Sequence, residues 1–578
     1  MAISPSYLLS SQPGGDPEPL SQLSEVASVS KNQRRYRPAR PLPYELNQHC
    51  VTFIEEELYS QAFSLLLNLL LAGADIDDDD DDDNKQPLHA YVPSSQIIAL
   101  AATLIVHPSV TNRARSQEQS QASNDALFYL NHLRALVGPA CPHFAASFDF
   151  GATSQTRQGR RRTHQQDAHD EDDDHGSLRI GLANHASLWS AAEDFWQVVG
   201  WAFNTSTCFP ERWERWKLWL TFMLDVMEDD LEASISASES QADSESKNEK
   251  LRSASDSSTS STLLAVYLRT AGEGRTGKRK IMRAILADGT KKNTAGFGEV
   301  WKNETKGVNL PKEEFTSKRQ RLNVAEGDFG DYLDVDDDDD DEGQDEKSNT
   351  LAPPLQSASA TRKRTLSDSS PTKTDAADAS TSTSNEFGGI ESILLRQRFM
   401  ALLVKLSSYD RSAFLDTDSL LDLYTESLRP LPLRIFVQFT LPTTPYLEPH
   451  AQATLNQTLL QPLISSDAPT FKAMTMTQEA FEKHYLPFPS NYASLIENAR
   501  VSILIEGLLR LLLRHLDLQI SVSLKRNLEL GIQARRDKAA GSGTRRKRVE
   551  RGVEDQHAAE VLEMSAARMR LLLVLIEQ

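Results

Sequence analysis

The apolar residues of this chain recur three or four positions apart, and this spacing constrains the fold more than any other feature. Tyr59 and Phe63 begin one apolar helical face that continues to Leu70, and residues 501–512 repeat the arrangement. The strict alternation typical of a half-buried strand is almost absent, and only LPLRIFVQFT, residues 432–441, looks like a strand. The sequence therefore predicts an all-α fold, with helices paired into bundles or an irregular solenoid.

Polar, acidic and serine-rich segments divide the predicted helices into two domains. Apolar residues make up 39% of the 578 residues, a low share for a wholly globular chain. Polar segments bury too little apolar surface to fold, so we expect them to be disordered. The predicted divisions are a disordered arm (1–42), an N-terminal helical domain (43–233) with a disordered loop at about 150–178, a serine- and acid-rich linker (234–260), a short, partly helical segment (261–305), a disordered acidic tether with basic clusters (306–385) and a C-terminal helical domain (386–578).

The most distinctive part of the N-terminal domain is rich in tryptophan. Six of the seven tryptophans lie between Trp189 and Trp219. Pro210, which suits the first turn of a helix, separates two apolar helical patterns in this block. The simplest arrangement is an antiparallel helix pair with an aromatic seam. Aromatic side chains serve both cores and binding surfaces, and we expect these to form core.

The charge and the cysteines limit the classes of function. The formal net charge is -20, which argues against a duplex-DNA binder because phosphate neutralisation needs concentrated Lys and Arg. Direct nucleic acid contact through local basic patches stays open. Three cysteines without a C-x-x-C pair fit a reducing compartment. We expect no membrane segment and no signal peptide, since the apolar runs are too short or carry charges.

GEGRTGKRK, residues 272–280, matches the G-x-x-x-x-G-K spacing of phosphate-binding loops through Gly272, Gly277 and Lys278. Such a loop needs a Ser or Thr directly after the lysine to hold magnesium, and Arg279 stands there instead. The preceding LLAVYLRTA is a candidate strand, but the chain has no βα alternation from which a nucleotide-binding sheet could grow. A basic turn before a helix is the preferred interpretation, and a nucleotide-binding enzyme is the less favoured alternative.

We expect no catalytic residue, no cofactor and no metal site. The chain has no G-x-S-x-G or H-E-x-x-H pattern. His164, His169 and His175 lie among aspartates, a composition that chelates metal weakly and lacks fixed geometry. The function indicated is therefore non-catalytic.

Four basic clusters resemble nuclear import signals in an otherwise acidic chain. We expect each in or beside a flexible segment, where an import receptor can reach it. Their residues are Lys278, Arg279 and Lys280; Lys318, Arg319 and Arg321; Arg362, Lys363 and Arg364; and Arg545, Arg546, Lys547 and Arg548. The clusters predict a nuclear protein.

An apolar anchor followed by acidic residues forms the candidate partner-binding motif. Its residues are Phe329, Tyr332, Leu333, Val335, Asp336 and Asp337. The motif resembles the acidic segments of histone chaperones, in which an aromatic side chain inserts beside the basic histone surface. Residues 332–335 also fit the outline of a SUMO-interacting motif, in which a short apolar strand joins a sheet edge while the acids face a basic rim.

Two serines are candidate phosphorylation sites. Ser370 is followed by Pro371 and Lys373, as cyclin-dependent kinases prefer, and Ser253 has an acidic residue three positions on, as acid-directed kinases prefer. Phosphate on Ser370 would add negative charge beside residues 362–364 and mask that import signal.

These patterns predict a nuclear scaffold or adaptor, with a chromatin or chromosome-maintenance complex as the leading context. Its expected partners are proteins, namely subunits of the complex, histones or SUMO, and an import receptor. A nucleolar ribosome-assembly factor is the alternative, because such a factor is also nuclear, acidic and helical.

Overall fold

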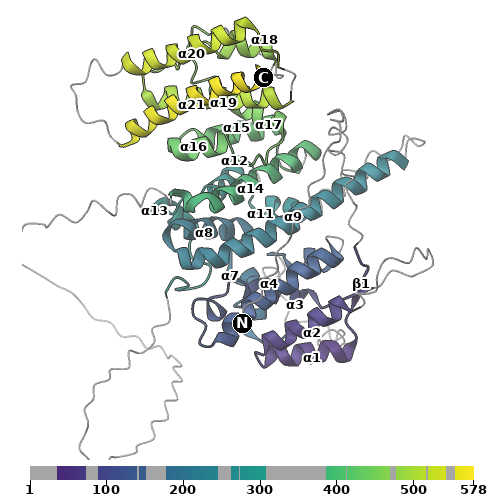
Figure 1. Cartoon of the computed structure of the whole chain (residues 1–578). Coiled ribbons are helices and arrows are strands. Elements are labelled where there is room, and N and C mark those ends of the chain that lie inside the picture. The colour runs from purple at the N-terminus through teal and green to yellow at the C-terminus, as the bar shows by residue number, and fades with distance from the viewer. Residues whose placement is uncertain are drawn as a thin grey trace, which may run out of the picture. The chain divides into compact units, whose positions relative to one another are not determined.

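The computed structural model describes residues 36–72, 89–138, 142–150, 178–244, 262–272, 274–306, 386–411, 413–468, 477–515, 518–541 and 553–577. These residues are mostly helical, which confirms the predicted all-α fold (Figure 1). The described residues before 307 and after 385 belong to one compact unit.

The first helices pack around an aliphatic core. They are α1 (Tyr44–Glu55), α2 (Tyr59–Leu71), α3 (Ser95–Leu104), α4 (Gln117–Val137) and α5 (Pro142–Ser147), with the short turns η2 (Pro108–Val110) and η4 (Gly181–Ala183). The apolar face of α2 buries Phe63, Leu66 and Leu70, and α2 packs against α4. Ser116 caps α4, since its hydroxyl accepts a hydrogen bond from the backbone N–H of Gln119.

Strands contribute little to the part of the chain that the structure describes. β1 (Ala39–Pro41) and β2 (Ala90–Val92) pair in parallel, with Ala39 opposite Ala90. This pairing joins the segment that leads into α1 to the segment that leads into α3.

The tryptophan block forms the predicted antiparallel helix pair. Its helices are α8 (Phe195–Cys208) and α9 (Pro210–Ser244), preceded by the short α7 (Leu188–Ala191). Phe195 lies beside Trp219 and Phe203 beside Trp213, so the two helices run in opposite directions. All six tryptophans of the block are buried, which confirms that they form core. α9 continues to Ser244, so the linker predicted to begin at 234 starts within a helix.

The segment predicted as short and partly helical is part of the core. It contains α11 (Leu263–Thr270), α12 (Gly274–Ile285) and α13 (Lys291–Gly296). Tyr267 stacks on Phe195 with ring centroids 4.0 Å apart, and its backbone carbonyl accepts a hydrogen bond from the indole N–H of Trp196. α12 packs against α8.

The remaining helices follow residue 385. They are η6 (Glu386–Gly388), α14 (Gly389–Tyr409), α15 (Thr417–Leu428), α16 (Leu433–Thr440), α17 (Pro449–Leu460), α18 (Gln478–Ala480), the π-helical η7 (Phe481–Tyr485), α19 (Leu495–His515), α20 (Val522–Ala540) and α21 (Val553–Glu577). α14 packs against α9, and α19 packs against α17, α20 and α21.

The strand expected at residues 432–441 is wrong, because this segment forms α16. Pro432 occupies the N-cap position, and the buried side chains Leu433, Phe436 and Phe439 recur every three residues on one helical face. A short apolar run fits a buried strand and a buried helix equally well by periodicity alone. Packing against α19 decides for the helix.

One hydrophobic cluster extends across both predicted helical domains. It includes Leu66 of α2, Trp196 of α8 and Phe399 of α14, and it continues to Met569 of α21. The boundary drawn between the domains remains a prediction. The described helices on its two sides share buried contacts.

Candidate functional site

A buried carboxylate fixes the chain at the point where residues 307–385 begin. Glu304 is fully buried, and one of its oxygens accepts hydrogen bonds from the indole N–H groups of Trp201, at 2.6 Å, and Trp216, at 3.1 Å. Arg212 donates to the same oxygen at 3.2 Å and 3.3 Å. The other oxygen accepts from the backbone N–H of Trp301. Every polar atom of this carboxylate is therefore paired.

Arg212 is the cation of this cluster and is buried in the first turn of α9. Its guanidinium also donates to the carbonyl of Val106, the hydroxyl of Thr111 and the side-chain oxygen of Asn112. Burial lowers the pKa of Arg212, and the charge of Glu304 opposes that shift. A buried ion pair with all its hydrogen bonds satisfied is costly to break, because either partner alone would be an uncompensated charge.

The backbone around Glu304 is held as firmly as its side chain. Asn112 donates to the carbonyl of Glu304 at 2.7 Å, and Arg113 donates to the carbonyls of Asn303 and Lys306. Asn303 has a φ of 58°, a left-handed conformation that surrounding contacts must stabilise. We call the Glu304 carboxylate and its partners the first anchor.

A buried arginine fixes the chain where residues 307–385 end. Arg396 of α14 is fully buried, and its guanidinium lies 4.1 Å from the ring centroid of Phe203 and 4.9 Å from that of Phe387. It donates to the carbonyl of Ile285 at 2.7 Å and to the hydroxyl of Ser392. Burial lowers the pKa of Arg396 to about 9. This cation–π and hydrogen-bonded group is the second anchor.

The backbone beside the second anchor needs glycine. Gly388 has a φ of 74°, and a Cβ at this position would lie 2.2 Å from the hydroxyl oxygen of Ser206. Only glycine adopts this conformation readily and permits so close an approach. Ser206 also lies 3.3 Å from the hydroxyl of Ser392, so the start of α14 is fixed against α8.

The two anchors meet the same helix. Trp201 of the first anchor and Phe203 of the second both belong to α8. The described residues on each side of 307–385 therefore contact α8. The import-like clusters at residues 318–321 and 362–364 and the partner-binding motif lie between these two anchors in the sequence. The cluster at residues 545–548 lies in the segment 542–552.

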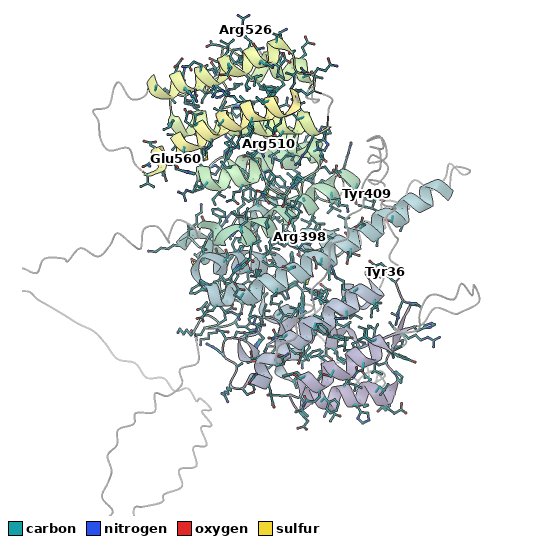
Figure 2. All side chains as sticks on the ribbon, viewed as in Figure 1. Tyr36, Arg398, Tyr409, Arg510, Arg526 and Glu560 are labelled. Carbon is teal, nitrogen blue, oxygen red and sulfur yellow. The ribbon has the colours of Figure 1, made fainter. Side chains whose placement is uncertain are left out.

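Ion pairs reinforce the contact between α14 and the helices before residue 307. Arg398, which is labelled in Figure 2, donates to Asp225 and Glu228 of α9, both at 2.7 Å. Burial acts to lower the pKa of Arg398, but its hydrogen bonds to Glu228 and Asp225 outweigh burial and raise it. Lys217 of α9 likewise contacts Glu391 of α14 at 2.7 Å.

The basic cluster at residues 278–280 was expected in or beside a flexible segment, and the structure places its residues within α12. Arg279 pairs with Glu426 of α15, and Lys280 donates to Asp194 at 2.6 Å. The apolar face of α12 buries Ile281 and Ile285, and this burial selects a helix over a flexible turn.

The glycine loop at residues 272–278 follows a helix, since LLAVYLRT forms α11 and the candidate strand is wrong. Gly272 and Gly274 have φ values of 93° and 86°, as expected for a tight turn. Gly277 is buried within α12, where a Cβ would lie 2.0 Å from the carbonyl oxygen of Gly272. This stretch thus follows α11 and from Gly274 onward forms part of α12, whereas a phosphate-binding loop connects a strand to a helix.

The other predicted site residues lie outside the described residues. They are Phe329, Tyr332, Leu333, Val335, Asp336 and Asp337 of the partner-binding motif, the import-like residues Lys318, Arg319, Arg321, Arg362, Lys363, Arg364, Arg545, Arg546, Lys547 and Arg548, and the phosphorylation candidates Ser370 and Ser253. The histidines at 164, 169 and 175 also lie outside them.

A small hollow lies between α14, α16 and α17. It contains about 270 Å³ of space, part of which is open solvent, and is lined by Gln397, Met400, Phe439, Pro442, Tyr446, Leu447, Gln452 and Leu455. Small-molecule sites usually enclose roughly 300–1,000 Å³. Among the described residues, no His, Cys, Asp and Glu side chains gather into a candidate metal site, and no helix is long and apolar enough to cross a membrane.

The anchor residues were not predicted from the sequence. Glu304 stands in the polar stretch KNETKG, which gives no sign of burial. Arg212 was visible only as a charge within the tryptophan block, and Arg396 only as a charge within an apolar helix. A charged residue inside an otherwise apolar helical pattern was the one available signal.

Comparison of this chain with protein-family models, with curated proteins and with solved structures found no match.

Proposed function

We propose that this chain is a non-catalytic nuclear scaffold, a subunit of a chromatin or chromosome-maintenance complex. In this role the helices form a fixed base that presents residues 307–385 to partner proteins. The observation that supports the proposal is the pair of anchors on α8, built around Glu304 and Arg396. A charged group buried at each boundary holds both ends of the segment in place.

Anchoring at two ends has a consequence for binding. A segment attached at both ends keeps its bound partner close to the helices, where the local concentration of a second binding surface is high. The motif at residues 329–337 would supply the first contact, through its apolar anchor and its acids. The helix faces would then add further contacts to the same partner or to another subunit.

Nuclear entry is assigned to the clusters at residues 318–321, 362–364 and 545–548. The cluster at 278–280 takes part in ion pairs on α12 and is less available to an import receptor. Imaging of fluorescent fusions tests this assignment. Glutamine at all basic positions of the three clusters should shift the protein to the cytoplasm, and glutamine at 278–280 alone should not.

The direct test is native affinity purification of the full chain from nuclear extract, with quantitative mass spectrometry before and after nuclease. A stoichiometric set of chromatin proteins that survives nuclease is the expected result. Ribosomal or pre-ribosomal partners would favour the assembly-factor alternative. Recovery of the chain alone would overturn the scaffold function.

A matched pair of variants connects this test to the motif. Tyr332→Ala with Leu333→Ala should release the partners that the motif holds. Leu322→Ala with Val324→Ala removes two apolar residues from the same segment and should release none. Equal losses from both variants would show that residues 332–333 have no specific role.

A further inference from the structure

The outward face of α21 is apolar although α21 already buries its opposite face. Met564, Leu571, Val574 and Leu575 are 48%, 56%, 50% and 58% exposed, and Ala567 lies between them and is also exposed. The buried face of the same helix includes Ala558, Val561 and Met569. We call the five exposed residues the α21 stripe.

The α21 stripe has the dimensions of a helix-binding surface. Met564, Ala567, Leu571 and Val574 follow each other at intervals of three, four and three residues, the spacing at which one helix receives the side chains of another. At about 1.5 Å per residue, the stripe is roughly 17 Å long, so it accommodates about three turns of one helix. A stable interface between two whole chains usually involves about 20–30 residues a side, whereas the stripe has five.

The two edges of the stripe differ in charge. On the α20 edge, Arg570 pairs with Glu529 at 2.7 Å and Glu563 pairs with Arg536, so positive and negative charges balance. On the α19 edge, both Arg510 and Arg568 pair with Glu506, so two cations share one buried carboxylate.

The excess positive charge extends along α19. Ser502 contacts Ser565 and Glu506 contacts Arg568, so α19 and α21 run in the same direction. Arg514 lies one turn after Arg510 on α19 and is exposed. Among these charged residues, those on the α19 edge carry an excess of positive charge, and the pairs on the α20 edge balance.

We infer that the α21 stripe binds an amphipathic helix of a partner protein, one with apolar residues at three- and four-residue intervals and acidic residues along one edge. The apolar residues cover the stripe, and the acidic edge faces the arginines of α19. The inference rests on the scaffold function, because it supplies one of the helix faces that a scaffold uses, and it is independent of residues 307–385.

Fluorescence polarisation with the full chain and two labelled peptides tests the inference. Both peptides are helical with leucine at the same three- and four-residue intervals; one carries glutamate along one edge, and the other carries lysine there. The glutamate peptide should bind at least tenfold more tightly than the lysine peptide. Equal binding of the two peptides, or no binding of the glutamate peptide, would overturn the inference.

Variants of the chain locate the binding surface. Leu571→Glu should weaken binding of the glutamate peptide at least tenfold, and Arg514→Glu should weaken it several-fold. Leu530→Glu is the matched control, because Leu530 is 51% exposed on α20 and lies outside the stripe. Both leucines are exposed, so neither change should unfold the chain, and circular dichroism checks this.

The alternative occupants give different results. Light scattering that shows a dimer, which Leu571→Glu converts to a monomer, would assign the stripe to a second copy and overturn the choice of partner. Tighter peptide binding after deletion of residues 326–342 would assign it to the acidic segment of this chain. The purified chain is used throughout, so failure here would leave the purification results for residues 332–333 unaffected.

Discussion

Replacement of Glu304 is the sharpest test of the first anchor. Glu304→Ala would leave the guanidinium of Arg212 buried without its counter-charge, together with the indole N–H groups of Trp201 and Trp216 without an acceptor. Removing one partner of a buried ion pair costs about 3–5 kcal/mol, and each neutral donor left unpaired costs about 1–3 kcal/mol. Because the three donors share one oxygen, these costs overlap, and we expect a loss of about 5 kcal/mol in the free energy of unfolding.

Tryptophan fluorescence during urea unfolding measures this loss. All seven tryptophans lie between Trp189 and Trp301, so the signal reports on the helices around the first anchor. Glu304→Gln keeps one oxygen and the shape of the side chain, and it should cost about 3 kcal/mol. Glu299→Ala is the matched control in the same segment, because Glu299 is exposed, and it should change stability by less than about 0.5 kcal/mol. Equal effects of Glu304→Ala and Glu299→Ala would refute the proposed burial of Glu304.

Three further predictions concern other buried groups. Arg535→Met should change the free energy of unfolding, measured by urea titration, by less than about 1.5 kcal/mol. Arg535 is buried, and its described partners are carbonyl groups with no carboxylate among them. A loss above about 3 kcal/mol would contradict this. Burial lowers the pKa of His107 from 6.5 to about 4, so its contribution to stability is present above pH 6.5 and is lost as the pH falls toward 4. Lowering the pH from 7 to 5 should therefore cost about 2 kcal/mol that His107→Gln does not show, and identical pH profiles of the two proteins would disprove this. Gly531→Ala should lower the free energy of unfolding by about 1–3 kcal/mol, because its Cβ would lie 1.9 Å from the carbonyl oxygen of Leu486. Gly541→Ala has no described atom within 4 Å of its Cβ and should lower it by less than about 0.5 kcal/mol. Thermal unfolding of the two variants tests this difference, and equal losses would contradict it.

The sequence predicted the helices well because their apolar residues repeat with the period of the helix over several turns. Residues 59–70 and the tryptophan block are examples, and both occupy the core as expected. Residues 432–441 failed because ten residues are too few to distinguish the two periods, and contact with α19 made the choice. The local pattern allowed either a strand or a helix, and tertiary packing selected the helix.

The anchors could not be predicted because their role depends on contacts between distant parts of the chain. Glu304 is buried only because α8 and α9 bring Trp201, Arg212 and Trp216 to it. The same holds for Arg396, whose guanidinium lies beside rings from α8 and η6. The spacing of residues along the sequence contains no information about which distant residues are in contact.

The helices before residue 307 and after residue 385 share one core. The ion pairs between α9 and α14 provide a way to weaken that core at one place. Arg398→Glu would place a third negative charge beside Asp225 and Glu228. It should weaken the association of the two parts without changing either part alone.

The most direct test of the shared core is cleavage of the full chain at a protease site inserted after residue 350. The two fragments should remain together at a one-to-one ratio in size-exclusion chromatography, and Arg398→Glu should make them separate more readily. Two fragments that elute independently and unfold at different temperatures would contradict a shared core and, with it, the anchoring of residues 307–385 at both ends.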